Sequence, residues 1–90
     1  MMLLEQKPTF KRAYKKLYDN QKKSVNQAIN SIVKDGSLGV EKKGDLSGIF
    51  VYKFDCVNQQ YLLAYEWGED WRRLLAIGPH ENFYRSLKSK

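Results

Sequence analysis

The spacing of apolar residues changes once along this 90-residue chain, and this change limits the fold to a helical part followed by a sheet. Up to Gly36, apolar side chains recur every three or four residues, which is the period of an α-helix. From Gly48 onward they form short β-branched and aromatic runs, which favour strands. We therefore expect an α+β domain with its helices first.

Two amphipathic helices are predicted in the first part. The first begins at Pro8, a residue that suits an opening helical turn. The second begins at Asp19 or Asn20 and stops at Gly36. Their apolar stripes consist of Phe10, Ala13, Tyr14, Leu17 and Tyr18, and of Val25, Ala28, Ile29, Ile32 and Val33. Because the helices follow each other closely, we expect a helical hairpin.

Three strands and a short last helix are predicted in the second part. The strands cover residues 49–54, 60–65 and 71–77, and the third is apolar enough to be the buried centre of the sheet. Residues 81–88 have the spacing of an amphipathic helix, and residues 2–5 can form a further short strand. The expected order is β-α-α-β-β-β-α, a small antiparallel sheet packed against the N-terminal helical hairpin.

Length and composition indicate a single domain over residues 1–90. An independent core usually needs about 50 to 200 residues, which excludes a multidomain enzyme. We find no apolar run long enough for a signal peptide or a membrane span, and the single cysteine, Cys56, cannot form an internal disulfide. We therefore expect a cytoplasmic protein that does not enter a membrane.

The charge balance favours a polyanionic or acidic partner. The chain has 16 Lys and Arg against 10 Asp and Glu, a formal charge of +6. Between Pro8 and Tyr18 there are basic residues and no carboxylate, a pattern that fits phosphate contacts but also an ordinary solvated helix face. The candidate nucleic-acid contacts are Lys11, Arg12, Lys15, Lys16, Lys22, Lys23, Arg72 and Arg85.

His80 is the first candidate catalytic residue. It is the only histidine and follows Gly78 and Pro79 at the end of the last predicted strand. Imidazole exchanges protons near neutral pH, so His80 can act as a general acid or base, although a lone histidine is more often structural. Strand alternation places Arg72 and Arg73 on opposite faces, and either can lie beside a cleft at this strand.

Other chemistry is not indicated by the residues. The carboxylates are scattered without the pairing that a magnesium site or two-carboxylate hydrolysis needs. One cysteine and one histidine are too few for a four-ligand zinc site. A phosphate-binding glycine loop and a serine nucleophile motif are both missing from the sequence. We therefore expect neither a metal nor a cofactor.

Three segments, together with the element order, resemble the RelE/ParE superfamily of toxins. They are LSGIFVYK at residues 46–53, YLLAY at 61–65 and LAIGPHENFY at 75–84. The resemblance covers nearly the whole chain, and its most specific part is the strand that ends in Gly-x-His and is followed by an aromatic residue. It implies a toxin of a bacterial type II toxin-antitoxin system, which a cognate antitoxin holds inactive.

Within that superfamily, the end of the chain favours the RelE-like branch, whose members cut messenger RNA in the ribosome. The resemblance matches His80 and Tyr84 to positions of the proposed cleavage site. This sequence departs from the branch at Leu62, where relatives often carry a basic residue. We expect Lys53, Arg72 or Arg73 to substitute for the missing charge.

The resulting hypothesis is a metal-independent endoribonuclease. When a ribose 2′-OH attacks the adjacent phosphorus, the protein must accept one proton, donate another and neutralise the charge on the phosphate. His80 would protonate the 5′-oxygen, Lys53 and Arg73 would hold phosphate oxygens, and Tyr84 would stack on or orient the base. The general base stays open. So small a catalytic set predicts that the ribosome orients the messenger RNA.

Two other functions stay open at this point. ParE-like members of the superfamily poison DNA gyrase and need no catalytic acid. A non-catalytic double-stranded RNA-binding domain has the order α-β-β-β-α and suits a basic protein. That module typically opens its last helix with a lysine cluster, whereas residues 81–83 here are Glu-Asn-Phe.

Overall fold

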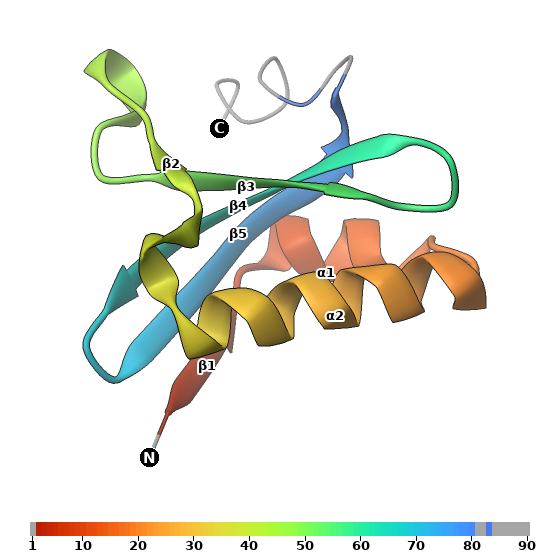
Figure 1. Ribbon diagram of the computed structural model, residues 1–90, viewed down its shortest axis with the longest axis horizontal. Coiled ribbons are helices and arrows are strands. Elements are labelled where there is room, and N and C mark those ends of the chain that lie inside the picture. The colour runs from red at the N-terminus through yellow and green to blue at the C-terminus, as the bar shows by residue number, and fades with distance from the viewer. Residues whose placement is uncertain (1, 81–82, 84–90) are drawn as a thin grey trace.

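A five-stranded sheet forms the middle of the protein in the computed structural model (Figure 1). The structure describes residues 2–80 and Phe83. The strands are β1 (Leu3–Gln6), β2 (Val40–Glu41), β3 (Phe50–Asp55), β4 (Gln60–Gly68) and β5 (Trp71–Pro79). Their order in the sheet is β1-β5-β4-β3-β2. The three strands predicted in the second half and the short N-terminal strand are therefore confirmed, with small differences at their ends.

The predicted α+β architecture is confirmed, and β1 adds one parallel pairing to the sheet that was expected to be antiparallel. β2, β3, β4 and β5 pair antiparallel with their neighbours, but β1 runs parallel to β5. Leu3 aligns with Trp71 and Gln6 with Leu74 in this parallel pair. Parallel neighbours need a long crossover connection, and here the helices, the other strands and their loops lie between the two strands in the chain.

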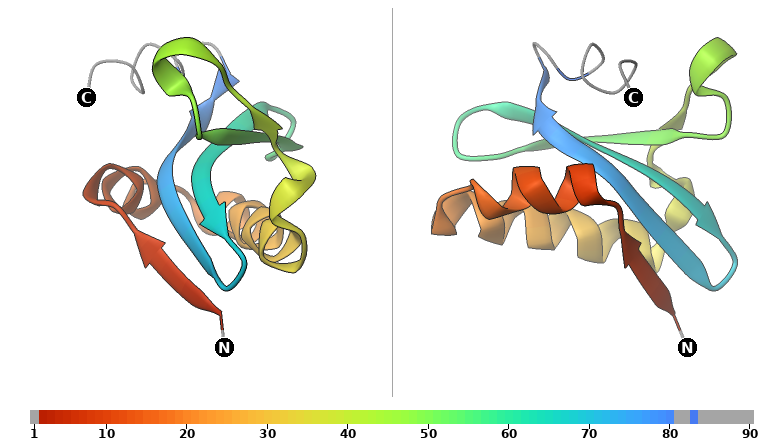
Figure 2. Two further views of the ribbon diagram at one scale, coloured as in Figure 1. Left: turned by 90° about the vertical axis from the view of Figure 1, so that its left-hand side faces the viewer. Right: turned by 180° about the vertical axis from the view of Figure 1, so that it is seen from behind.

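Two helices, α1 (Pro8–Lys15) and α2 (Asp19–Lys34), cover one face of the sheet, which confirms the predicted hairpin (Figures 1 and 2). α1 begins at Pro8 as predicted. The backbone N–H of Tyr18 donates to Oε1 of Gln21 at 2.8 Å, which caps the start of α2. Tyr18 was expected in the apolar stripe but is 77% exposed, because the chain turns between the helices there.

The main core lies between the helices and this face of the sheet. It contains Phe10, Val25, Ala28, Ile32, Cys56, Tyr61, Leu63, Tyr65, Leu74 and Ile77. Large apolar side chains in this set are almost fully buried, and each contributes about 1.5 to 3 kcal/mol relative to an exposed position. Because the helices and this core cover one face of β3, β4 and β5, a functional site on these strands has to lie on the opposite face.

A second, smaller cluster covers the opposite face of the sheet. It consists of Val51, Leu62, Ala64, Ala76 and Phe83, with Leu46, Ile49 and Leu75 packed against it. β4 is consequently buried on both faces over residues 61–65 and is the middle strand. The strand from Trp71, which was predicted to be the centre, lies one place away, between β4 and β1.

The connection from α2 to β3 carries the chain along the β3 edge to the second face (Figure 2). It contains β2 and two short 3₁₀ helices at Gly36–Leu38 and Gly44–Leu46, none of which was predicted. The Tyr65 hydroxyl donates to the Gly36 carbonyl at 2.6 Å and accepts from the Gly39 N–H at 2.9 Å. Burial raises the pKa of Tyr65, so this hydroxyl stays protonated and anchors the connection.

The predicted last helix, residues 81–88, lies outside the described residues except for Phe83, which is buried in the second cluster. Within the described part of the chain, we find no helix with the length and apolarity needed to cross a membrane.

Candidate functional site

A pocket of about 410 Å³ lies where β2, β3 and the end of β5 meet on the second face of the sheet. Three segments that are far apart in the sequence contribute to it. The described residues that line it are Leu38, Val40, Lys42, Val51, Tyr52, Lys53 and His80. The pocket thus brings together His80 and Lys53, two residues that the sequence analysis named as catalytic.

The register of the sheet explains why His80 and Lys53 meet. Lys53 aligns with Leu62 in β4, and Leu62 aligns with Gly78 in β5. Lys53 and Gly78 are therefore two strand spacings apart, about 10 Å between their backbones. His80 follows two residues after Gly78, just past the end of β5. Phe83 packs beside Gly78, since a Cβ at Gly78 would lie 4.0 Å from the Phe83 ring.

His80 and Lys53 are both exposed, so a substrate can reach them from solvent. His80 lies at a pocket wall shared with the cationic side chains of Lys42 and Lys53 rather than inside an apolar core. A general acid must come within hydrogen-bond reach of the atom it protonates, and the exposure of His80 leaves it accessible to an anion held at this pocket.

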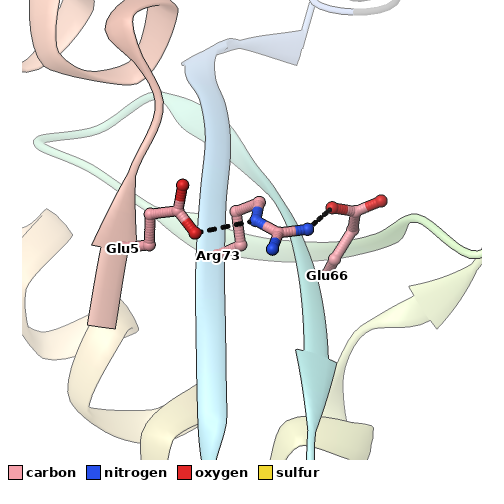
Figure 3. A network of polar contacts seen from close by, with 3 residues as sticks. All are labelled: Glu5, Glu66 and Arg73. Carbon is pink, nitrogen blue, oxygen red and sulfur yellow. Dashed lines mark hydrogen bonds and ion pairs between the residues drawn. The ribbon is translucent and has the colours of Figure 1, made fainter. Parts of the chain in front are cut away.

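Arg73 lies at the other end of β5 and is held by two carboxylates (Figure 3). Its Nε donates to Glu5 Oε1 and its Nη1 donates to Glu66 Oε1, both at 2.9 Å. The hydrogen bonds that Arg73 donates, first to Glu5 and then to Glu66, raise the pKa of Arg73, while Arg73 lowers the pKa of Glu5. Arg73 therefore links β1, β5 and β4.

The position of Arg73 corrects its expected role. Arg73 precedes His80 by seven residues, which is more than 20 Å along an extended strand, on the order of 3.3 Å per residue. It lines a separate pocket of about 320 Å³ with Leu3, Glu5, Asp70, Trp71 and Arg72. One phosphate cannot contact both Arg73 and His80 in this arrangement, so Arg73 does not belong to the His80 site.

Arg72 is buried, with 4% of its surface exposed, and serves the fold. Its Nε donates to the Ile32 carbonyl at 2.8 Å and its Nη2 to the Val33 carbonyl at 3.2 Å. These carbonyls belong to the last turn of α2, where backbone acceptors lack partners within the helix and the helix dipole favours a cation. The prediction that Arg72 contacts nucleic acid is therefore corrected.

The basic residues of α1 form a surface of their own. Lys11, Arg12 and Lys15 line a pocket of about 460 Å³ together with Gln6, Pro8 and Tyr14. Of the described residues, none lines both this pocket and the one at His80.

Most of the predicted N-terminal nucleic-acid contacts are accessible to solvent. Lys11, Arg12, Lys15, Lys16 and Lys23 are exposed, and the Lys22 ammonium lies 5.6 Å from the centre of the Tyr14 ring. Exposure is what a nucleic-acid surface and a solvated helix face both require, so these residues remain predicted contacts.

Two predicted site residues, Tyr84 and Arg85, lie outside the described residues. Conversely, Lys42 lines the pocket and was missed by the sequence analysis. Its sequence signal was weak because residues 36–48 match neither a helical nor a strand period. The pairing of β2 with β3 brings Lys42 to the residues around His80.

The fold is similar to solved toxin structures. A chain of the intact E. coli RelBE toxin-antitoxin complex superposes with a TM-score of 0.70 and 13% sequence identity, over 90% of this chain and 99% of that one. The isolated E. coli RelE toxin gives a TM-score of 0.67 and 13% identity, over 99% and 98% of the two chains. The conserved hypothetical protein HP0894 from Helicobacter pylori gives 0.55 and 24%, over 89% and 96%.

These identities are low, and the structural likeness by itself establishes the fold. No curated protein gives a significant match to the sequence. A family model described as "ParE-like toxin of type II bacterial toxin-antitoxin system" matches residues 4–88, which is nearly the whole chain. The predicted membership of the RelE/ParE superfamily is therefore confirmed, and the chain belongs to the ParE-like toxins of type II bacterial toxin-antitoxin systems.

Proposed function

We propose that this toxin is a ribosome-dependent endoribonuclease that cleaves messenger RNA and thereby inhibits translation. The observation that carries the proposal is the pocket in which exposed His80 lies with Lys42 and Lys53. A proton donor beside fixed cations suits the transition state of phosphodiester cleavage. A toxin that acts only by binding another protein has no chemical need for this combination.

In the proposed reaction, the ribose 2′-hydroxyl gives its proton to a solvent water, its oxygen bonds to the adjacent phosphorus, and the bond from phosphorus to the 5′-oxygen breaks. His80 donates its proton to the departing 5′-oxygen, which leaves as a hydroxyl. The Lys53 ammonium offsets the negative charge that develops on the phosphate oxygens. The exposed apolar side chains of Leu38 and Val40 offer a surface for a base, and Tyr84 orients that base.

The ribosome has a defined part in this proposal. The pocket presents an acid and cations, but its described lining contains no carboxylate and no second histidine to act as the base. Holding the 2′-oxygen in line with the leaving group can contribute as much to the rate as a catalytic group does. We assign this orientation to the ribosome, which places the activity in the cytoplasm and makes free RNA a poor substrate.

A cognate antitoxin is the second proposed partner. The E. coli structure with a similar fold is itself a toxin-antitoxin complex. A formal charge of +6 favours an acidic segment as the neutralising partner. In this proposal the antitoxin blocks cleavage when it is added in equal amounts to the toxin.

The test is cleavage of messenger RNA on programmed ribosomes by the wild type and by His80→Ala. We expect loss of a positioned general acid to slow cleavage by about 10²- to 10⁴-fold. Circular dichroism of both proteins checks that the exposed change leaves the fold intact. Cleavage by His80→Ala at the wild-type rate would contradict the assignment of His80.

Inhibition of DNA gyrase is the second candidate, because the matching family model carries the ParE-like name. This function requires neither His80 nor messenger RNA. A supercoiling assay separates the two candidates: gyrase inhibition without cleavage on ribosomes would replace the nuclease proposal. The double-stranded RNA-binding alternative is not retained, because the whole-chain family match is to toxins.

A further inference from the structure

We propose that Lys42 is a substrate-binding residue of the His80 pocket and holds the RNA phosphate next to the one that is cleaved. This inference rests on the proposed ribonuclease function. It assigns a role to a residue on the connection between α2 and β3, outside β3, which carries Lys53, and outside β5, which ends just before His80.

The described part of the sheet beside the pocket supplies little charge to hold an RNA backbone. Across the row of aligned residues Lys53, Leu62 and Gly78, Lys53 carries the positive charge. Leu62 is fully buried and apolar, and Gly78 has no side chain. A strand of RNA brings one negative charge per phosphate, so a substrate that spans the pocket needs a cation from elsewhere.

Pairing of β2 with β3 places Lys42 on the face that needs this charge. Val40 aligns with Val51, which belongs to the second cluster, and Lys53 lies two residues further along on the same face of β3. Lys42 follows Val40 by two residues, so its side chain shares that face. The Lys42 N–H donates to the Ile49 carbonyl at 2.8 Å, which continues the pairing past β2 and fixes the Lys42 backbone.

The spacing of the two lysines indicates that they bind different phosphates. Lys42 lies opposite Ile49, four residues from Lys53 along β3, which corresponds to about 13 Å between backbones. Both line the same pocket, with Val40 and Val51 between them. Lys53 is the closer in register to the end of β5, where His80 lies. We therefore assign the cleaved phosphate to Lys53 and the neighbouring one to Lys42.

A matched control is the next residue in the chain. Lys43 has the same charge as Lys42 but is exposed and is not among the residues that line the pocket. Alanine at either position removes one positive charge from the same connection. A general electrostatic effect on RNA binding would therefore appear equally in both variants, whereas a specific contact would appear in one.

The experiment measures kcat and KM for cleavage on programmed ribosomes by the wild type, Lys42→Ala, Lys43→Ala and Lys42→Arg. We expect Lys42→Ala to raise KM about tenfold with little change in kcat, because a phosphate away from the reacting atoms is held equally in the ground and transition states. Lys43→Ala should stay within about twofold of the wild type, and Lys42→Arg should restore most of the affinity.

A second measurement uses messenger RNA with a 2′-deoxy residue at the cleavage position, which binds without reacting. Lys42→Ala should reduce the dependence of log affinity on log salt concentration by about one unit of slope relative to Lys43→Ala. Thermal unfolding of each variant shows whether it is folded, and Lys42→Gln replaces Lys42→Ala if alanine prevents folding.

The outcomes separate this inference from the function on which it rests. If the wild type cleaves and the Lys42 and Lys43 variants have the same KM and salt slope, the Lys42 assignment is wrong and the nuclease proposal stands. A fall in kcat alone would also overturn it, since it would place Lys42 at the cleaved phosphate. Absence of cleavage by the wild type on ribosomes would overturn both.

Discussion

Replacing Arg72 by alanine should destabilise the folded protein by about 3 kcal/mol, because its guanidinium satisfies four backbone carbonyls. The bond to the Ile32 carbonyl is buried, and loss of a buried partner costs about 1 to 3 kcal/mol. The bonds to Val33, Gly68 and Trp71, at 3.2, 2.6 and 2.8 Å, are partly buried, so water replaces part of each.

The remaining terms have opposite signs and partly cancel. Alanine also removes the contact with the Trp67 ring, whose centre lies 5.1 Å from the guanidinium carbon. In the opposite direction, burial of the Arg72 charge destabilises the folded wild type, and alanine removes this unfavourable free energy. Because a domain of this size is stable by only about 5 to 15 kcal/mol, a loss of 3 kcal/mol is easily measured.

Urea unfolding followed by tryptophan fluorescence is the assay. With a slope of about 1.5 kcal/mol/M, the unfolding midpoint should fall by about 2 M. Arg73→Ala is the matched control, since it removes the neighbouring arginine, whose two ion pairs are partly exposed to solvent and contribute less than the buried contacts of Arg72. Arg72→Lys should recover only part of the loss, because one ammonium group cannot donate to four carbonyls that lie in different directions. An Arg72→Ala midpoint no lower than that of Arg73→Ala would refute the capping role.

Two further changes test the contacts that hold β1 and the α2–β3 connection. Arg73 keeps the pKa of Glu5 below its ordinary value of 4.5, so the ion pair stabilises the fold above that pH and the contribution is lost as the pH falls through the lower folded value. Glu5→Gln should thus lower the Tm at pH 7, and this difference from the wild type should shrink as the pH falls below 4.5; an equal difference at pH 7 and in acid would contradict this. Tyr65→Phe removes the bonds to Gly36 and Gly39 and should cost about 1 to 3 kcal/mol in urea unfolding; an unchanged midpoint would show that the hydroxyl does not anchor this connection.

The sequence predicted the elements of this fold better than their neighbours in the sheet. Apolar periodicity located both helices and the three main strands, because it reports which side of each element is buried. It carries no information on partners, so the parallel pairing of β1 with β5 and the central place of β4 were not predictable. The apolar runs at residues 61–65 and 74–77 look alike in the sequence, and only the added strand β1 distinguishes their positions.

The candidate site likewise contains residues that the sequence predicted and one that it did not. His80 was predicted from its place after a strand, and Lys53 from RNA chemistry, and the structure puts both in one pocket. Alternation showed that Arg72 and Arg73 face opposite sides but not which side meets the helices. Lys42 left no signal, because β2 is only two residues long and gains its position from β3.

The contacts of the cationic side chains explain why the His80 pocket depends on the connection between α2 and β3. Of the two arginines on β5, one closes the end of α2 and the other joins three strands through Glu5 and Glu66. Of the residues that the structure describes, the cations that line the pocket at the far end of β5 are Lys53 of β3 and Lys42 of the segment before it. That segment is held against the sheet by the Tyr65 hydroxyl, whose partners Gly36 and Gly39 lie just before β2. A hydroxyl of the main core, on the helix side of β4, thus helps to set the position of charges on the opposite face.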